Sequence, residues 1–310
     1  MRGFAGTAAL GTRLAAARQD RIGAAVIDAI AYADLFDWPL SAAEVHRYLP
    51  MAASSPEVAV ALEGCARSGE VVRSGALHFL PGRDCLVTRR RERAAASARL
   101  WPRAIRACRR LAALPWIRLI AVSGSLAVGA ADDDDDVDLF IVTVEGRVWL
   151  ARALTIAVGR RIAPMTEGRG TWLCPNYIVS TGALALPERD LFTAHELAQL
   201  VPLQGEATYR ALLTANSWYR DFLPNHPGDA RCVGELGGRF TRRAVESVLR
   251  NGLVSRAELW ERERKIARLT AQRHPPEVRF DAAVCKGHFG QFRQRTLHAL
   301  STGTRLEATA

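Results

Sequence analysis

Apolar residues recur at helical spacing near the N-terminus. Between residues 20 and 35 they return to one face every three or four positions, at Ile22, Val26, Ile30, Ala33 and Leu35. Trp38-Pro39 ends this helix. Ser41, with Glu44 three residues later, has the spacing of a capping box and predicts a short second helix.

A third helix and a hairpin follow. Ser55 as cap, with Pro56 in the first turn, predicts a helix whose apolar stripe continues to Cys65. Residues 71–73 and 77–80 are β-prone segments around the turn Ser74-Gly75, which predicts a hairpin. Three helices followed by a hairpin is the order of a winged helix, so residues 20–84 are predicted to form a winged-helix-like module.

The middle of the chain changes to strand patterns. Residues 117–122, 137–144 and 172–180 are predicted strands, and residues 148–162 a helix. After Pro187 the pattern is helical, and the predicted segments are 190–201, 205–222, 231–251, 255–273 and 287–300. The fold class predicted is α+β. It consists of an extension (1–19), the winged-helix-like module (20–84), a basic helical connector (85–114), a small mixed-sheet core (115–186) and a helical region (187–310).

Charge narrows the choice of partners. The formal net charge is +10, and only two of the 42 basic residues, Lys265 and Lys286, are lysines. Residues 83–110 hold ten arginines against two acids, so Arg89, Arg90, Arg91 and Arg93 are candidate contacts to a nucleic-acid backbone. The predicted third helix carries Glu57 and Glu63 against Arg67. Its slightly acidic character favours a packing or protein-contact role over insertion into a DNA groove.

Cysteine spacing and hydropathy bear on location. The six cysteines stand alone, without a C-x-x-C pair, which favours reduced thiols and a cytoplasmic protein over a disulfide framework or a zinc site. No apolar stretch is long enough to predict a membrane helix. Residues 1–19 contain three arginines and no acid before Gln19. They are interpreted as a frayed extension rather than a transit peptide.

Two short motifs carry the candidate chemistry. The first predicted strand ends in Val122-Ser123-Gly124-Ser125, and the next begins at Asp136-Val137-Asp138. Backbone N–H groups at a Gly-Ser turn suit a phosphate, and glycine permits its close approach. Asp136 and Asp138 are two apart on a strand and therefore point to the same face. Two neighbouring carboxylates repel one another unless a cation such as Mg²⁺ neutralises them. Asp132 to Asp135 are interpreted as a flexible acidic lead-in.

This arrangement resembles the nucleotidyltransferase superfamily typified by DNA polymerase beta. Gly124-Ser125, then Asp136-Val137-Asp138-Leu139, match its two half-motifs in order and spacing. The wider sequence is similar to bacterial nucleotidyltransferase-domain proteins with a preceding winged-helix-like region. The resemblance implies that Gly124 and Ser125 hold phosphates of an NTP, and that Asp136 and Asp138 bind Mg²⁺, with two ions in an active site.

One expected element is missing. The resemblance implies a third carboxylate on the third core strand, but residues 172–180 contain no acid. Asn176 is the nearest polar residue, and an amide can position a ligand without accepting a proton. Glu196 or Asp221 from the helical region could substitute by folding back. Lys286 is a candidate phosphate contact, with a surface position as the alternative.

The function predicted is Mg²⁺-dependent transfer of a nucleoside monophosphate from an NTP to a hydroxyl acceptor of unknown identity. Asp136, Asp138, Asn176 and Glu196 are the predicted catalytic residues, and Gly124, Ser125 and Lys286 the predicted nucleotide contacts. The alternative is a non-catalytic regulator. Such a protein would sense a nucleotide, or bind nucleic acid or protein, and its nucleotidyltransferase site would be degenerate.

Overall fold

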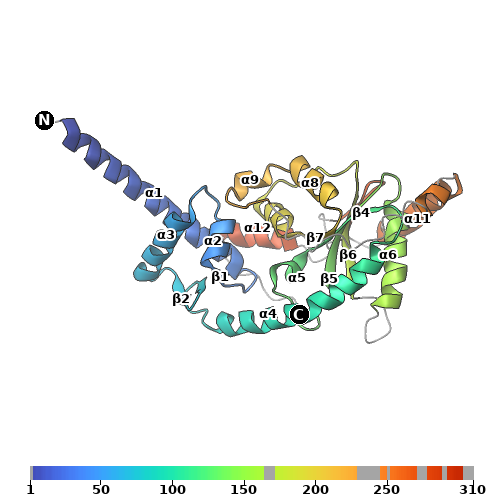
Figure 1. The fold of residues 1–310 in the computed structure, drawn as a ribbon, viewed down its shortest axis with the longest axis horizontal. Helices are drawn as coiled ribbons and strands as arrows, with labels where there is room; N and C mark the ends of the chain where they lie inside the picture. Colours follow the sequence, from blue (N-terminus) through green and yellow to red (C-terminus); the bar gives the residue numbers. More distant parts are fainter. Residues whose placement is uncertain are drawn as a thin grey trace. The chain divides into compact units, whose positions relative to one another are not determined.

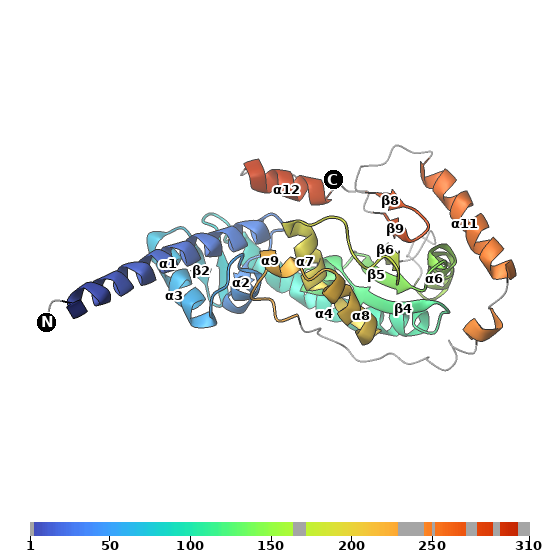
Figure 2. The ribbon, with the colours of Figure 1, turned by 90° about the horizontal axis from the view of Figure 1, so that it is seen from above.

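A computed structural model describes residues 3–163, 172–228, 245–249, 252–270, 278–287 and 292–302. The chain divides into two compact units (Figures 1 and 2). The first unit comprises Met1–Arg91, Trp218–Pro227 and Thr296–Ala310, and the second comprises Glu92–Ser217 and Gly228–Arg295. Each is described by itself. No helix among the described residues is both long enough and apolar enough to cross a membrane.

The N-terminal part of the first unit is three helices with a small antiparallel sheet. Its elements are α1 (Gly3–Asp34), β1 (Leu40–Ser41), α2 (Ala42–Tyr48), α3 (Ser55–Ser68), β2 (Val72–Ser74) and β3 (Leu77–Phe79). The predicted hairpin is confirmed as β2 and β3, and β1 adds to its other edge in the order β1-β3-β2. The predicted extension is wrong for residues 3–19, because α1 begins at Gly3 and is continuous.

Helix caps in this unit follow the sequence closely. Ser41 and Glu44 form the predicted capping box at α2. At α3 the cap is Ser54 rather than the predicted Ser55, and Glu57 completes its capping box. A Ser-Ser-Pro sequence offers two candidate caps. Ser54 is selected because Glu57, three residues on, can then hydrogen-bond back to its backbone N–H.

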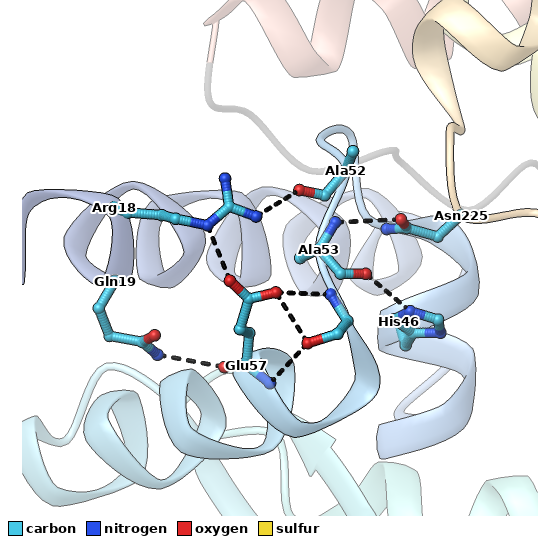
Figure 3. A network of polar contacts seen from close by, with 8 residues as sticks. Arg18, Gln19, His46, Ala52, Ala53, Glu57 and Asn225 are labelled. Carbon is cyan, nitrogen blue, oxygen red and sulfur yellow. Dashed lines mark hydrogen bonds and ion pairs between the residues drawn. The ribbon is translucent and has the colours of Figure 1, made fainter. Parts of the chain in front are cut away.

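Polar contacts tie α1 to the start of α3 (Figure 3). Arg18 Nε donates to Glu57 Oε1 at 2.7 Å, and Gln19 Nε2 donates to the Glu57 carbonyl at 3.1 Å (Figure 3). The loop before α3 is held by Asn225, whose Oδ1 accepts from Ala53 N–H at 3.1 Å. The acidic residue at the beginning of α3 is therefore already paired within the unit.

The second unit is built on a six-stranded mixed sheet in the order β7-β4-β5-β6-β9-β8. The strands are β4 (Ile117–Val122), β5 (Val137–Thr143), β6 (Leu173–Ser180), β7 (Val201–Gln204), β8 (Arg279–Phe280) and β9 (Val284–Lys286). Only β5 and β6 pair in parallel, and the helix α6 (Val148–Ile162) forms the crossover between them. The remaining pairs are antiparallel.

The two faces of this sheet bury different side chains. One face packs against α4 (Cys85–Leu111), within which the unit boundary falls, and against α6. Alternate residues of β5, namely Val137, Leu139 and Ile141, belong to that apolar core. The residues between them, Asp138 and Phe140, point to the opposite face, where α7 (Leu191–Gln199) lies over the sheet.

The region after Pro187 is less helical than predicted. Besides α7, its helices are α8 (Glu206–Ala215), α9 (Tyr219–Phe222), α11 (Gly252–Thr270) and α12 (Phe292–Thr302). It also supplies β7, β8 and β9 to the sheet. Of the predicted helix 231–251, residues 245–248 are helical, and residues 231–244, 250 and 251 lie outside the described part of the chain.

Candidate functional site

The turn after β4 brings the backbone against Asp138. Ser123 N–H donates to the Asp138 carbonyl at 3.0 Å, and the helix α5 (Gly124–Val128) starts directly afterwards. Gly124 has a φ of +64°, and a Cβ at this position would lie 2.4 Å from Asp138 Oδ2. Only glycine avoids both the steric clash and the backbone strain. The two half-motifs, separated along the chain, therefore meet in space.

Three side chains gather at the start of β5. Ligand atoms of Asp136, Asp138 and Cys174 all lie within 4.8 Å of one another. Cys174 is opposite Asp138 in the parallel β5–β6 register, so its thiol shares the face of the two carboxylates. Cys174 was not predicted as a site residue. Its position on the predicted third strand, beside Asn176, could have indicated that it lies near the two carboxylates.

An irregularity in β6 positions Asn176. Cys174 pairs with Asp138 and Tyr177 with Phe140, so three residue steps on β6 match two on β5. The extra residue falls at Pro175-Asn176, and proline is tolerated in a strand mainly at such bulges. Asn176 Nδ2 donates to Asp138 Oδ1 at 3.0 Å. The predicted polar residue of this strand thus contacts the carboxylate directly.

The surroundings of the site disfavour the charged form of its carboxyl groups. Burial, together with the neighbouring charges of Asp136 and Glu196, raises the pKa of Asp138 to about 7, against the effect of the Asn176 hydrogen bond. Burial also raises the pKa of Asp136, although the hydrogen bond from Cys174 opposes the shift. A cation between the two carboxylates would relieve this repulsion.

The donor set fits a hard divalent cation. Carboxylate oxygens are the ligands that Mg²⁺ prefers, whereas thiols favour softer metals. Burial, together with the charges of Asp138 and Asp136, raises the pKa of the Cys174 thiol to about 12. Without a metal the thiol is therefore protonated at neutral pH, and the two carboxylates are the hard donors of this group.

Hydrogen bonds and ion pairs fix the acidic loop before β5. Ser125 Oγ donates to Asp135 Oδ2 at 2.9 Å, and the same oxygen accepts from Asp132 N–H at 3.1 Å. Asp132 also pairs with Arg93, and Asp133 pairs with Arg99 on α4. The loop predicted as a free lead-in is thus tied to both α5 and α4. Ser125, predicted to contact phosphate, donates its hydroxyl proton within the protein.

Glu196 reaches the same face of the sheet from α7. Its side chain lines a pocket together with Ser123, which precedes the glycine of the turn. Burial raises its pKa to about 7, and the positive charge of Lys286 opposes the shift. Glu196 and Asp138 influence one another electrostatically. Glu196 is thus near enough to Asp138 to raise its pKa, but it is not one of the three residues whose ligand atoms lie within 4.8 Å of one another. Asp221, the other acid considered, lies on α9 in the first unit.

Lys286 is a buried, paired lysine. Its side chain on β9 is 7% exposed, and Nζ lies 3.0 Å from Glu188 Oε1 and 5.2 Å from the centre of the Tyr177 ring. Burial opposes ionisation of Glu188, but the hydrogen bond and charge of Lys286 outweigh burial and lower the pKa of Glu188. The surface alternative is therefore wrong. Its partner, Glu188, was not predicted from the sequence.

Three of the four arginines proposed for nucleic acid form ion pairs within the protein. Arg89 pairs with Asp37 at 2.5 Å and Arg93 with Asp132 at 3.1 Å. Arg90 pairs with Glu44 at 2.9 Å and stacks on Trp38 at 4.0 Å. Arg91 is exposed on α4. Three of the four candidate charges are therefore balanced locally.

Other polar residues of the helical region have structural roles. Asn216 is fully buried, where its Oδ1 accepts from Leu186 N–H at 2.8 Å and its Nδ2 donates to the Leu184 carbonyl at 2.7 Å. His195 is buried on α7, with Nδ1 3.4 Å from Gln199 Nε2. Both residues help to position the segment before α7 and α7 itself.

Comparison with known proteins returned no match: no family model fits the chain, and neither the curated proteins nor the solved structures contain a matching relative. The function must therefore be inferred from the geometry of the site.

Proposed function

We propose that the second unit is an Mg²⁺-dependent nucleotidyltransferase of the DNA polymerase beta type, which transfers a nucleoside monophosphate from an NTP to a hydroxyl acceptor. One observation carries the proposal. Gly124, at the turn after β4, has no room for a Cβ because Asp138 Oδ2 would lie 2.4 Å from it. A backbone turn suited to phosphate thus directly adjoins a pair of carboxylates suited to Mg²⁺.

Each residue then has a defined role. Bound Mg²⁺ would supply charge neutralisation for the phosphates of the NTP. Asp136 and Asp138 would hold the cation, and the backbone around Gly124 would face the phosphates. Asn176 fixes Asp138 through its 3.0 Å hydrogen bond. Glu196, whose pKa of about 7 lies near neutral pH, would accept the proton of the acceptor hydroxyl.

The first unit is proposed to be a winged-helix-like module that contacts protein rather than DNA. Its three helices and the β1-β3-β2 sheet follow that order. Glu57 at the start of α3, the helix expected to enter a groove, is paired with Arg18. The Arg18 guanidinium and the capping hydrogen bonds from Ser54 hold the pKa of Glu57 near 2, so a carboxylate stays charged where DNA would place phosphate.

The nucleotidyltransferase proposal is tested with Asp136→Asn/Asp138→Asn against a matched control, Asp133→Asn/Asp134→Asn. The control removes the same charge from the exposed acidic loop. Transfer from each of the four α-³²P-labelled NTPs, tested against a mixture of hydroxyl compounds, is expected to fall about 100-fold or more in the site variant. It should remain close to wild type in the control. Equal transfer by both variants would refute the site assignment. Mg²⁺-dependent NTP binding without transfer would favour the non-catalytic regulator.

A further inference from the structure

A row of exposed arginines runs along the part of α4 that belongs to the second unit. Arg99, Arg103, Arg106 and Arg110 follow one another at intervals of three or four residues, so their side chains share one face of the helix. Arg109 adjoins them, and all five are exposed. We call these five residues the arginine stripe. None of them is among the four arginines that were predicted to contact nucleic acid.

Most of the stripe has no acidic partner. Its first member pairs with Asp133, but in the part of the chain that the structure describes no carboxylate forms an ion pair with Arg106, Arg109 or Arg110. The sequence gives a reason for the difference, because residues 93–131 contain no Asp or Glu. The positive charge of these three side chains therefore faces solvent without local compensation.

The end of α6 continues this basic surface. Arg160 and Arg161, in the last turn of the helix, are exposed. Trp172 connects them to the stripe. Its backbone N–H donates to the carbonyl of Ala163, which follows the helix, at 3.1 Å, and the guanidinium of Arg103 lies over its ring at 5.2 Å. The C-terminal end of α6 is thus linked to the middle of the stripe.

The basic surface and the carboxylates belong to different faces of the sheet. Both α4 and α6 pack against the face formed by Val137, Leu139 and Ile141, whereas Asp138 points to the face covered by α7. A ligand of the stripe is therefore distinct from a ligand of the candidate metal site.

The chemistry of the stripe suits the backbone of a nucleic acid. Guanidinium groups form forked hydrogen bonds to phosphate oxygens. At a rise of about 1.5 Å per residue, the stripe is about 16 Å long, which matches about five phosphates of one strand at about 3.4 Å each. A membrane surface fits less well. Interfacial helices also expose large apolar side chains, and α4, which the structure describes throughout, exposes none.

We propose that the arginine stripe of α4, together with the end of α6, binds nucleic acid through its phosphate backbone. Contacts of this kind carry no sequence information, so the affinity should depend on salt rather than on base sequence. The inference does not depend on the proposed nucleotidyltransferase activity, because the stripe and the carboxylates lie on different faces of the sheet.

The test compares two variants of the full-length protein that lose the same charge. The stripe variant is Arg106→Gln/Arg109→Gln/Arg110→Gln. The control changes three exposed arginines of other elements, Arg67→Gln/Arg189→Gln/Arg210→Gln. Fluorescence anisotropy with a short labelled DNA duplex of arbitrary sequence measures the affinity over a range of salt concentrations. In the stripe variant the affinity should fall at least about tenfold, and the slope of log Kd against log salt should decrease by about 2.7, at about 0.9 per lost phosphate contact. The control should bind like wild type.

A third variant separates charge from structural damage. Arg106→Lys/Arg109→Lys/Arg110→Lys keeps the charge and should keep the salt slope of wild type, with weaker binding because an ammonium lacks the planar fork. Equal losses of affinity in the stripe variant and the control would overturn the inference, since the duplex would then respond only to the net charge of the protein. Binding to phosphatidylserine vesicles that is lost in the stripe variant, while duplex binding is unchanged, would assign the stripe to a membrane and also overturn it. Displacement of the duplex by Mg²⁺ and α,β-methylene-ATP would place the nucleic acid at the carboxylates instead.

Discussion

The two faces of the second unit's sheet contrast within a single strand. On β5, Leu139 and Ile141 are fully buried against the apolar layer of α4 and α6. Asp138 and Phe140 alternate with them and face α7, where Asp138 accepts a hydrogen bond from Asn176 and its pKa is raised by the charges of Asp136 and Glu196. One face is thus built as a core, and the other gathers an exposed carboxylate, Asp136, and two partly buried ones, Asp138 and Glu196.

This difference shows where the fold departs from maximum stability. Apolar burial on the α4 face stabilises the unit in proportion to the area removed from water. The carboxylates on the α7 face destabilise it whenever they are charged, because they are partly desolvated and of like sign. Such a conflict is expected where chemistry rather than packing determines the residues. The following predictions test the contrast, from the largest expected effect to the smallest.

Leu139→Ala should destabilise the protein more than any substitution of a carboxylate on the α7 face. The side chain is 0% exposed in the core cluster, and a buried Leu→Ala change lowers the free energy of unfolding by about 2–5 kcal/mol. Urea unfolding followed by circular dichroism measures the effect. A loss below about 1 kcal/mol would show that the α4 face is not the principal core.

Asp138→Asn should stabilise the metal-free protein at pH 8. The folded-state pKa is raised from 3.8 to about 7, so the native state binds the proton more tightly than the unfolded state. The stabilisation that comes from protonating Asp138 is therefore lost as the pH rises from about 4 to 7, and it is absent from the wild type above pH 7. The gain should be about 1–3 kcal/mol at pH 8, since the carboxyl is partly exposed, and should vanish near pH 4. Thermal unfolding at both pH values tests this, and destabilisation at pH 8 would contradict it.

Gly124→Ala and Gly129→Ala form a matched pair. Both glycines have positive φ, but only at Gly124 would a Cβ meet another group, Asp138 Oδ2. Backbone strain should lower stability by about 1 kcal/mol in each variant. Mg²⁺-dependent nucleotide binding, measured by calorimetry, should weaken about tenfold or more in Gly124→Ala alone. Equal weakening in both variants would assign the effect to strain rather than to the site.

Cys174→Ser should change metal preference with little change in stability. The thiol adjoins both carboxylates, and thiols favour soft metals. Cd²⁺ binding should weaken several-fold in the variant, whereas Mg²⁺ binding should change by less than about two-fold. Fluorescence competition with a metal indicator distinguishes the two. A large loss of Mg²⁺ affinity would make Cys174 part of the Mg²⁺ site.

Much of the fold could be predicted because long periodic segments determine their own structure. Residues 117–122 and 148–162 form β4 and α6 with the predicted bounds. The strands β7, β8 and β9 were missed because segments of two to four residues show no periodicity. They become strands through their pairing with β4, β6 and one another. Tertiary context, rather than local preference, decides such elements.

The candidate site was predicted only in part. Gly124 and Asp138 were predicted because they belong to two half-motifs that follow one another within a short stretch of the sequence. The place of Cys174 depends on the β5–β6 register, and that of Glu188 on a pair formed across about a hundred residues. The basic connector and the run of five aspartates are separate in the sequence, but Arg93 and Arg99 form ion pairs with Asp132 and Asp133. Composition alone could not reveal that these charges balance.

The most direct test of the central claim is the Mg²⁺ dependence of nucleotide binding. Calorimetric titration with α,β-methylene-ATP compares wild type, Asp136→Asn/Asp138→Asn and Asp133→Asn/Asp134→Asn at pH 8 and pH 5.5. Wild type and the loop control should bind only with Mg²⁺, and more weakly at pH 5.5 because protonation of Asp138, with a pKa of about 7, competes with the cation. The site variant should lose binding at both pH values. Mg²⁺-dependent binding that is unchanged in the site variant would contradict the account.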